Sequence, residues 1–344
     1  MKRGRLKTTL IIIALLCIVA AMAIRYYMER FGANITQEVT LYIKEDSLTV
    51  EELRPLFEGK IRNFNSFARV AEKNGLQGAI KRGRYSFQKG TGNIEMIRAL
   101  EFGWESPFNL VLSGNIRGME KLCSILGKRM MYDSASFSNY FNSPRTWEKY
   151  GTDRANFLSR FIPDTYQIYW SCTPEEFTER MNREYEKFWS GERDKKAKAL
   201  DLTREQVSTL ASILCEESNY SPELPAIAGV YINRLRRGLK LEADPTVKFA
   251  LKDPSIKRIL YRHLTIDSPY NTYKYKGLPP GPITIPQISG IDAVLDYQKH
   301  DYLYFCASDK LDGTHKFAKT YAEHNANAQR YRRAISKQGI REGK

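Results

Sequence analysis

Cysteine is scarce in this sequence, and no group of cysteines has the spacing of a metal site. Only five of the 344 residues are Cys, and their wide spacing matches neither a zinc-binding nor a redox motif. For Cys123, Cys172, Cys215 and Cys306 we expect buried free thiols, with one disulfide as an open alternative. Histidine is also rare, with four scattered residues. The sequence therefore predicts no metal and no cofactor.

The chain also lacks internal repeats, long Pro/Gly/Ser-rich linkers and the motifs of nucleic-acid-binding modules. Its 54 Lys and Arg exceed 39 Asp and Glu, which gives a formal net charge of +15. Such an excess favours an anionic partner, such as a lipid surface, a nucleic acid or an acidic polymer. Because the basic residues are dispersed among acidic ones, we do not expect nucleic acid to be the partner.

One apolar run, at residues 8–24, is long enough to span a membrane, although its 17 residues are at the short limit. Four basic residues within 1–7 precede it, so this tail is expected in the cytoplasm and the bulk of the chain outside. The sequence thus predicts a single-pass anchor in the inner membrane. A cleaved signal peptide is the alternative, because Ala21-Met22-Ala23 resembles a cleavage site.

Beyond this run the hydrophobic periodicity predicts an α+β chain, whose length allows about two domains. Strands are predicted at 39–43, 83–87, 108–112 and 302–307, and helices within 47–57, 61–74 and 93–102 and from residue 322 onward. Residues 116–190 have a mainly helical pattern, interrupted at 161–166 by a predicted loop that contains Pro163.

Residues 210–220, LASILCEESNY, form the most informative stretch of the chain. The segment Thr203-Arg-Glu-Gln206 fits a capping box, so a helix is predicted to begin there. Apolar residues then recur at helical spacing, at Val207, Leu210, Ala211 and Leu214. The predicted helix has an apolar face and ends in two adjacent carboxylates, Glu216 and Glu217.

Helical geometry separates these two glutamates. At about 100° per residue, Glu217 lies at the edge of the apolar face, whereas Glu216 lies roughly opposite and is expected to be solvated. Partial desolvation and the negative C-terminal end of the helix both raise the pKa of Glu217. A raised pKa is what a general acid requires near neutral pH. An ion pair of Glu217 with a nearby arginine such as Arg234 is the structural alternative.

Polar and aromatic segments follow this helix. Pro225 suits the first turn of a second helix and Gly238 its end. Further along are LEADPT at 241–246, which is predicted to be a turn, YNTY at 270–273 and a rigid proline-rich loop at 277–286. Aromatic faces beside amide and hydroxyl groups suit a sugar polymer as the ligand.

Together these segments resemble the YceG-like family of endolytic murein transglycosylases. The family pattern is an A-S-I-x-E-x-E-[TS] helix, then INRL, ADPTV or TDPTV, YNTY, GLPPGPI, a YLYF strand and G-x-H-x-F. The matching segments stand at 211–218, 232–235, 243–247, 270–273, 277–286, 302–305 and 313–317, and FIPDTY at 161–166 is similar to the family's FPDTY. Their order and spacing cover roughly residues 161–325.

The resemblance implies that Glu217 is the catalytic glutamate. The residues expected to line the substrate groove are Asn233, Arg234, Asp244, Thr246, Tyr270, Asn271 and His315. Asp244 is also the candidate for a second carboxylate in a hydrolase, or it caps the turn before Pro245. Two departures from the family pattern stand out: Cys215 replaces the first glutamate of E-x-E, and LSGN at 112–115 replaces a PEG turn.

The resemblance further implies a cytoplasmic tail at 1–7, an anchor at 8–24, a small LysM-like domain at 38–110 and a mixed helix/strand catalytic domain at 111–340. The implied substrate is the peptidoglycan glycan strand, cut between MurNAc and GlcNAc with a 1,6-anhydro end, which would terminate nascent strands. Membrane-bound peptidoglycan synthases are the implied protein partners. A weakly active or inactive wall-binding or division scaffold of the same fold is the alternative.

Overall fold

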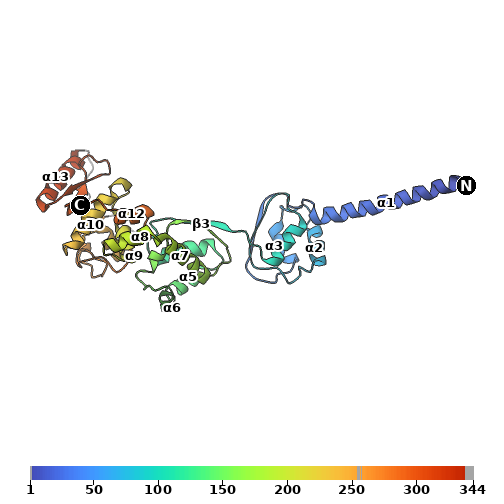
Figure 1. Cartoon of the computed structure of the whole chain (residues 1–344), viewed down its shortest axis with the longest axis horizontal. Coiled ribbons are helices and arrows are strands. Elements are labelled where there is room, and N and C mark those ends of the chain that lie inside the picture. The colour runs from blue at the N-terminus through green and yellow to red at the C-terminus, as the bar shows by residue number, and fades with distance from the viewer. Residues whose placement is uncertain (1, 254–255, 257, 338–344) are drawn as a thin grey trace. The chain divides into compact units, whose positions relative to one another are not determined.

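A computed structural model of the chain describes residues 2–253, 256 and 258–337 (Figure 1). Contacts divide the chain into two compact units, Met1–Asn109 with Arg129–Met131 and Gln167–Cys172, and Leu110–Lys128 with Tyr132–Tyr166 and Thr173–Lys344. Helices and strands are mixed in both units, as the α+β prediction requires.

The first unit begins with α1 (Lys2–Phe31), whose segment Leu6–Phe31 is long and apolar enough to cross a membrane, with a mean hydropathy of 2.5 over an apolar window of 18 residues. The helix therefore continues past residue 24, where the predicted span ends. Its last turns contact the folded unit (Figure 1): Arg69 donates to Glu29 Oε1 at 2.7 Å, and Asn93 Nδ2 donates to the Glu29 carbonyl at 2.8 Å. The apolar helix is thus continuous with the first unit.

The rest of the first unit is a two-stranded sheet packed with short helices. In chain order its elements are β1 (Val39–Ile43), η1 (Glu51–Phe57), α2 (Phe64–Lys73), β2 (Gly83–Phe87) and α3 (Asn93–Phe102). β1 and β2 are antiparallel with Leu41 opposite Tyr85, and both side chains are buried. The predicted strands 39–43 and 83–87 and the helix 93–102 are confirmed. The LysM-like character of this region stays a prediction.

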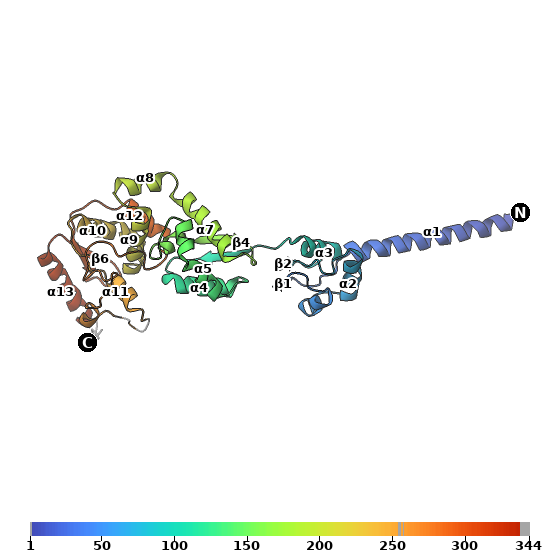
Figure 2. The same cartoon turned by 90° about the horizontal axis from the view of Figure 1, so that it is seen from below.

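The second unit is mainly helical. Its elements are β3 (Phe108–Leu112), α4 (Gly118–Arg129), α5 (Ser134–Phe141), α6 (Pro144–Lys149), η2 (Phe157–Arg160), β4 (Asp164–Ile168), α7 (Pro174–Trp189), α8 (Glu192–Ala199), α9 (Arg204–Glu217), η3 (Ser221–Glu223), α10 (Leu224–Arg236), α11 (Asp244–Leu251), η4 (Tyr261–His263), α12 (Ile288–Leu295), β5 (Tyr304–Ala307), β6 (His315–Ala318) and α13 (Tyr321–Lys337). β3 pairs with β4. The division of the chain into two units falls within each of these strands, after Asn109 in β3 and after Tyr166 in β4. β5 and β6 are antiparallel, and α13 packs on them (Figure 2).

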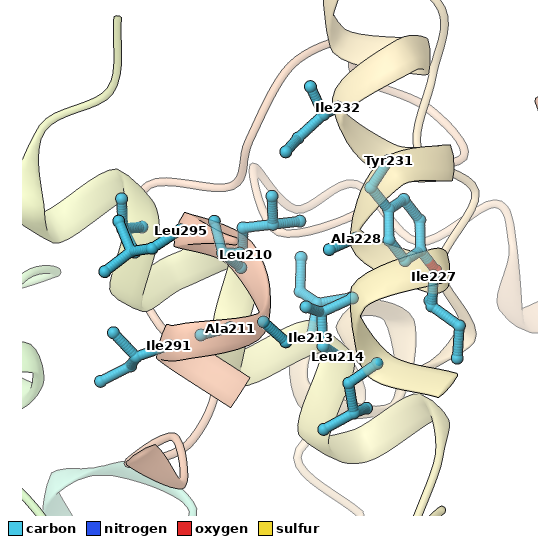
Figure 3. Packing of buried hydrophobic residues seen from close by; sticks show 14 of the residues in the cluster. Leu210, Ala211, Ile213, Leu214, Ile227, Ala228, Tyr231, Ile232, Ile291 and Leu295 are labelled. Carbon is cyan, nitrogen blue, oxygen red and sulfur yellow. The ribbon is translucent and has the colours of Figure 1, made fainter. Parts of the chain in front are cut away.

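Helix α9 lies at the centre of the core of this unit. It begins at the predicted capping box of Thr203 and Gln206, and Leu210, Ala211 and Leu214 are fully buried. Figure 3 shows these side chains packed against α10 and α12, which are contributed by later parts of the sequence. Burial on all sides fixes the direction of α9, and therefore the place of the two glutamates at its C-terminal end.

Two local predictions are wrong for the same physical reason. The sequence predicts a loop at 161–166, whereas β4 begins at Asp164; it predicts a turn at 241–246, whereas α11 begins at Asp244. Pro163 precedes the first residue of the strand, so its missing N–H removes no hydrogen bond within it. Pro245 lies in the first turn of α11, where backbone N–H groups have no partner within the helix. Neither proline therefore breaks the element.

Close packing of α12 on α9 depends on Gly290 and on the small side chain of Cys215. A Cβ at Gly290 would overlap the Cys215 sulfur, and all five cysteines are free thiols. We expect Gly290→Ala to lower the free energy of unfolding by about 1–3 kcal/mol, as overpacking of a filled core does. Chemical denaturation of Gly290→Ala and of Gly290→Ala/Cys215→Ala measures this. The second substitution should restore most of the loss, and an unchanged loss would show that the clash lies elsewhere.

Candidate active site

Glu217 is the last residue of α9 and is partly exposed. Its Oε1 accepts a hydrogen bond of 2.9 Å from the hydroxyl of Tyr231 in α10. The ring of Tyr231 is 2% exposed and stands edge-on to Phe305 of β5, with 5.9 Å between ring centroids. A carboxyl group at the end of one helix is therefore positioned by a rigid hydroxyl from the next.

The surroundings of Glu217 favour its protonated form. The pKa of the carboxyl is raised to about 7, chiefly by burial and to a smaller extent by the negative charges of Asp244 and Glu216, against the opposing hydrogen bond from Tyr231. A carboxyl with a pKa near neutrality holds a proton and can also release it, as acid–base catalysis requires. An ion pair of Glu217 with Arg234 does not form, because Arg234 binds Glu242 and the carbonyls of Lys240 and Leu303.

Asp244 is the second carboxylate of this cluster. It is the first residue of α11, where the positive end of the helix stabilises a negative charge. Its Oδ1 accepts a hydrogen bond of 2.6 Å from the hydroxyl of Tyr273, the last residue of YNTY. Burial first, and then this bond and the charges of Asp244 and Glu217, raise the pKa of the Tyr273 hydroxyl well above its usual value. Tyr273 therefore stays a neutral donor.

Hydrogen bonds between the two motifs hold Asp244 and Tyr273 in place. Thr246 and Thr272 are buried, and their hydroxyls are 2.8 Å apart. Thr246 donates to the Ala243 carbonyl, and the Ala243 N–H donates to the Thr272 hydroxyl. Asn271 is fully buried, and its amide donates to two backbone carbonyls of the preceding loop. These contacts place Thr246 and Asn271 in the framework of the site.

The other predicted groove residues lie in several places. The amide of Asn233 donates to the carbonyls of His300 and Tyr302, and Arg234 is buried at 8% exposure. Tyr270 is half-buried, with its ring on Phe249. The structure therefore uses the polar groups of Asn233 and Arg234 to join α10 to the segment before β5. Their direct contact with a substrate stays a prediction.

His315 of β6 is bound by Glu223 of η3. Its backbone N–H donates to the Glu223 carboxylate, and its Nδ1 is 2.8 Å from Glu223 Oε2. The His315 ring also packs edge-on against Phe305, which in turn contacts Tyr231. Aromatic packing therefore links His315 to the residue that holds Glu217, and its predicted binding of substrate stays a prediction.

The expectation that Glu216 is solvated is wrong. Its side chain is 11% exposed and forms a two-point ion pair with Arg117, whose Nε donates to Oε1 at 3.1 Å. Arg117, Tyr231 and Tyr273 were not among the predicted residues. Tyr231 directly precedes INRL and Tyr273 ends YNTY, so their places in the motifs were the available signal. Nothing in the sequence near Arg117 connects it with α9.

The raised pKa of Glu217 predicts a pH-dependent effect on stability. Its folded pKa of about 7 lies above the ordinary 4.5, so the stabilisation by proton binding is complete below about pH 4.5 and is lost as the pH rises through about 7. Glu217→Gln should therefore have the wild-type free energy of unfolding near pH 4 and exceed it by about 3 kcal/mol near pH 8. Urea titrations measure this, with the exposed Glu192→Gln as control. A difference independent of pH would contradict the raised pKa.

The chain is similar to proteins of one known family. The model of the YceG-like family matches residues 41–330. Over 126 residues the chain is 45% identical to an endolytic murein transglycosylase of Bacillus subtilis strain 168, covering 36% of this chain and 33% of that protein. Over 170 residues it is 32% identical to the protein of that name from Streptococcus pneumoniae serotype 2 strain D39, covering 48% of this chain and 30% of that one. The chain thus spans about a third of the length of these curated relatives.

A solved structure shows the same fold. The crystal structure of a yceG-like protein from Listeria monocytogenes superposes with a TM-score of 0.55 at 25% identity, over 84% of this chain and 98% of that one. The family model alone covers well over half of the described chain, and it includes α9, α10, α11 and the β5–β6 pair. This chain belongs to the YceG-like family.

Proposed function

We propose that this chain is an endolytic lytic transglycosylase, which cuts the β-1,4 bond between MurNAc and GlcNAc in peptidoglycan and leaves a 1,6-anhydro-MurNAc end. The observation that carries the proposal is the environment of Glu217: a partly buried carboxyl with a pKa of about 7, held by Tyr231. The names of its relatives in Bacillus subtilis and Streptococcus pneumoniae support the substrate. Such cuts would terminate nascent glycan strands.

In the proposed reaction Glu217 acts twice. Its protonated carboxyl gives a proton to the glycosidic oxygen, so that the bond from C1 to this oxygen breaks and positive charge develops at C1. The resulting carboxylate then takes the proton of the C6 hydroxyl of the same muramyl sugar, while the C6 oxygen bonds to C1. Glu217 is protonated again at the end, and no water is consumed. One carboxyl with a pKa near neutrality suits both steps.

Asp244 supports the reaction without transferring a proton. Its carboxylate lies close enough to raise the pKa of Glu217, and its hydrogen bond from Tyr273 fixes its orientation. A negative charge near C1 stabilises the positive charge that develops there in the transition state. In ordinary glycosidases the second carboxylate instead acts as nucleophile or as base for water.

Mass analysis of the products tests this function. Full-length protein in detergent is incubated with purified peptidoglycan, and the soluble products are examined for anhydro or reducing muramyl ends. We expect anhydro ends on fragments of many lengths, because an endolytic enzyme cuts within strands. Release of single disaccharides only would contradict endolytic cleavage.

A weakly active wall-binding or division scaffold is the second candidate. Cys215, in place of the family's first glutamate, is the observation that favours it. The same digest distinguishes the two, because a scaffold would bind peptidoglycan and release no fragments.

We also propose that α1 is a single-pass anchor in the inner membrane, with residues 1–7 in the cytoplasm and the rest of the chain on the other side. The last turns of α1 are bound to the first unit, because Arg69 donates to Glu29. Cleavage after Ala23 would separate these turns from the apolar part of the helix, so the contact supports an anchor over a cleaved signal peptide. Within this arrangement, 38–110 is proposed as a LysM-like domain and 111–340 as the catalytic domain, with membrane-bound peptidoglycan synthases as partners.

A further inference from the structure

A polar cavity of about 520 Å³ lies in the second unit, next to the C-terminal end of α9. Its lining residues come from the loop before α4, from α4 itself, from the end of α9 and from the segment that follows α9: Asn115, Arg117, Lys121, Cys215, Glu216 and Asn219. Glu217 directly follows two of them in the chain, but its carboxyl faces Tyr231 and is not part of the lining. The proposed catalytic step does not use this cavity.

The charge of the cavity is positive. Arg117 and Lys121 contribute two cations, and Glu216 contributes one carboxylate. Arg117 uses Nε and Nη2 to bind Glu216, so Nη1 of its five-donor guanidinium faces no carboxylate within the described part of the chain. Lys121 is exposed and forms no ion pair with any described residue. An anionic group would therefore meet two cations, one of them already fixed in position.

The loop that carries Arg117 is held rigidly. The Asn115 N–H donates to the Ile285 carbonyl at 2.9 Å, and the Ile285 N–H donates to the Ile116 carbonyl at 3.0 Å. Gly114 lies so close to Gln287 that a Cβ there would overlap it. Because these bonds fix the two residues that directly precede Arg117, its side chain is presented to the cavity before any ligand arrives.

Both departures from the family pattern meet at this cavity. Cys215 stands in place of the family's first glutamate, and Asn115 ends the LSGN segment that stands in place of its PEG turn. A glutamate at position 215 would add a negative charge to the lining, and Cys215 adds none. The change at position 215 therefore makes the lining less negative than the family pattern would.

We propose that this cavity binds a carboxylate of the peptide attached to the muramyl sugar, so that the enzyme selects strands that carry peptides. The inference rests on the proposed function, because the peptide branches from the same sugar whose C1 bond Glu217 would cleave. Arg117 offers the planar donors that suit a carboxylate, and Lys121 adds a mobile cation at the exposed side. Asn115 and Asn219 supply amides for the peptide backbone.

Cleavage of two substrates by charge-reversed variants tests the proposal. Lys121→Glu is compared with Lys128→Glu, an exposed lysine of the same helix α4 outside the cavity. Each full-length protein is assayed on peptide-bearing strands and on strands from which an amidase has removed the peptides. For Lys121→Glu we expect the loss of kcat/KM on peptide-bearing strands to exceed the loss on bare strands about tenfold. Lys128→Glu should show no such difference, and equal losses of Lys121→Glu on both substrates would overturn the proposal.

A binding measurement decides the matter even if no cleavage occurs. In the Glu217→Gln background, the affinity for peptide-bearing and bare strands is measured with and without Lys121→Glu. A preference for peptide-bearing strands that Lys121→Glu removes supports the peptide site, whether or not the wild-type protein cuts the strand. The absence of any preference in the Glu217→Gln protein would refute the site, and wild-type protein that binds but never cuts would refute the proposed function alone.

Discussion

Replacing Glu217 with glutamine is expected to lower the rate of anhydro-end formation about a thousandfold or more. General acid–base catalysis contributes roughly 10²–10⁴ in rate, and this one carboxyl would supply both proton transfers. Glutamine keeps the size of the side chain and an oxygen that can accept the bond from Tyr231, so the fold should be retained. The measurement is the initial rate of product release from peptidoglycan by the two proteins at equal concentration.

The matched control is Glu192→Gln, an exposed carboxylate on α8 with only a surface ion pair to Lys195. It should leave the rate unchanged, since exposed pairs of this kind contribute little. If Glu217→Gln retained more than about a tenth of the wild-type rate, its carboxyl could not be the main proton donor. In that case Asp244 would become the next candidate.

Substitutions on the two sides of Glu217 are expected to move the pH profile in opposite directions. The wild-type kcat/KM should fall about tenfold per pH unit above about pH 7, as the acid loses its proton. Asp244→Asn removes a negative charge that raises the pKa of Glu217, so the decline should begin at lower pH. Tyr231→Phe removes a hydrogen bond that lowers this pKa, so the decline should begin at higher pH.

The quantity to compare is the pH at which kcat/KM begins to decline on the alkaline side. The absolute rate is less informative, because each substitution also changes the catalytic site. Thermal unfolding of both variants at one pH shows whether the fold is intact. If the pH at which kcat/KM begins to decline moved in the same direction in both variants, or in neither, another group would control this decline. A shift in opposite directions would be hard to produce by general destabilisation.

The sequence predicts most strands and several helices, α9 among them, because their side chains repeat with a regular period, whereas it misses α11 and α12. The apolar face of α9 and the place of Glu217 at its edge follow from Leu210, Leu214 and the capping box alone. The position of Glu216 could not be predicted in this way. A helical wheel contains only the helix itself, and Arg117, which pairs with Glu216, is 99 positions earlier in the chain.

The same limit applies to the hydroxyls of the site. Tyr231 and Tyr273 belong to segments whose distance from Glu217 depends on how α10 and the loop before α12 fold back on α9. Residues with conspicuous polar side chains, such as Asn271, were expected in the groove, whereas the fold uses them to satisfy buried carbonyls. Sequence patterns identify which segments form the site, and tertiary packing decides which side chains face it.

The most direct test of the central claim is a digest in oxygen-18-labelled water with wild-type protein and Glu217→Gln in parallel. If Glu217 closes the C6 hydroxyl onto C1, the wild-type products have anhydro ends without the label, and Glu217→Gln gives almost none. Labelled reducing ends from the wild-type protein would show that water is the nucleophile. Anhydro ends formed by Glu217→Gln at the wild-type rate would show that another residue carries the reaction.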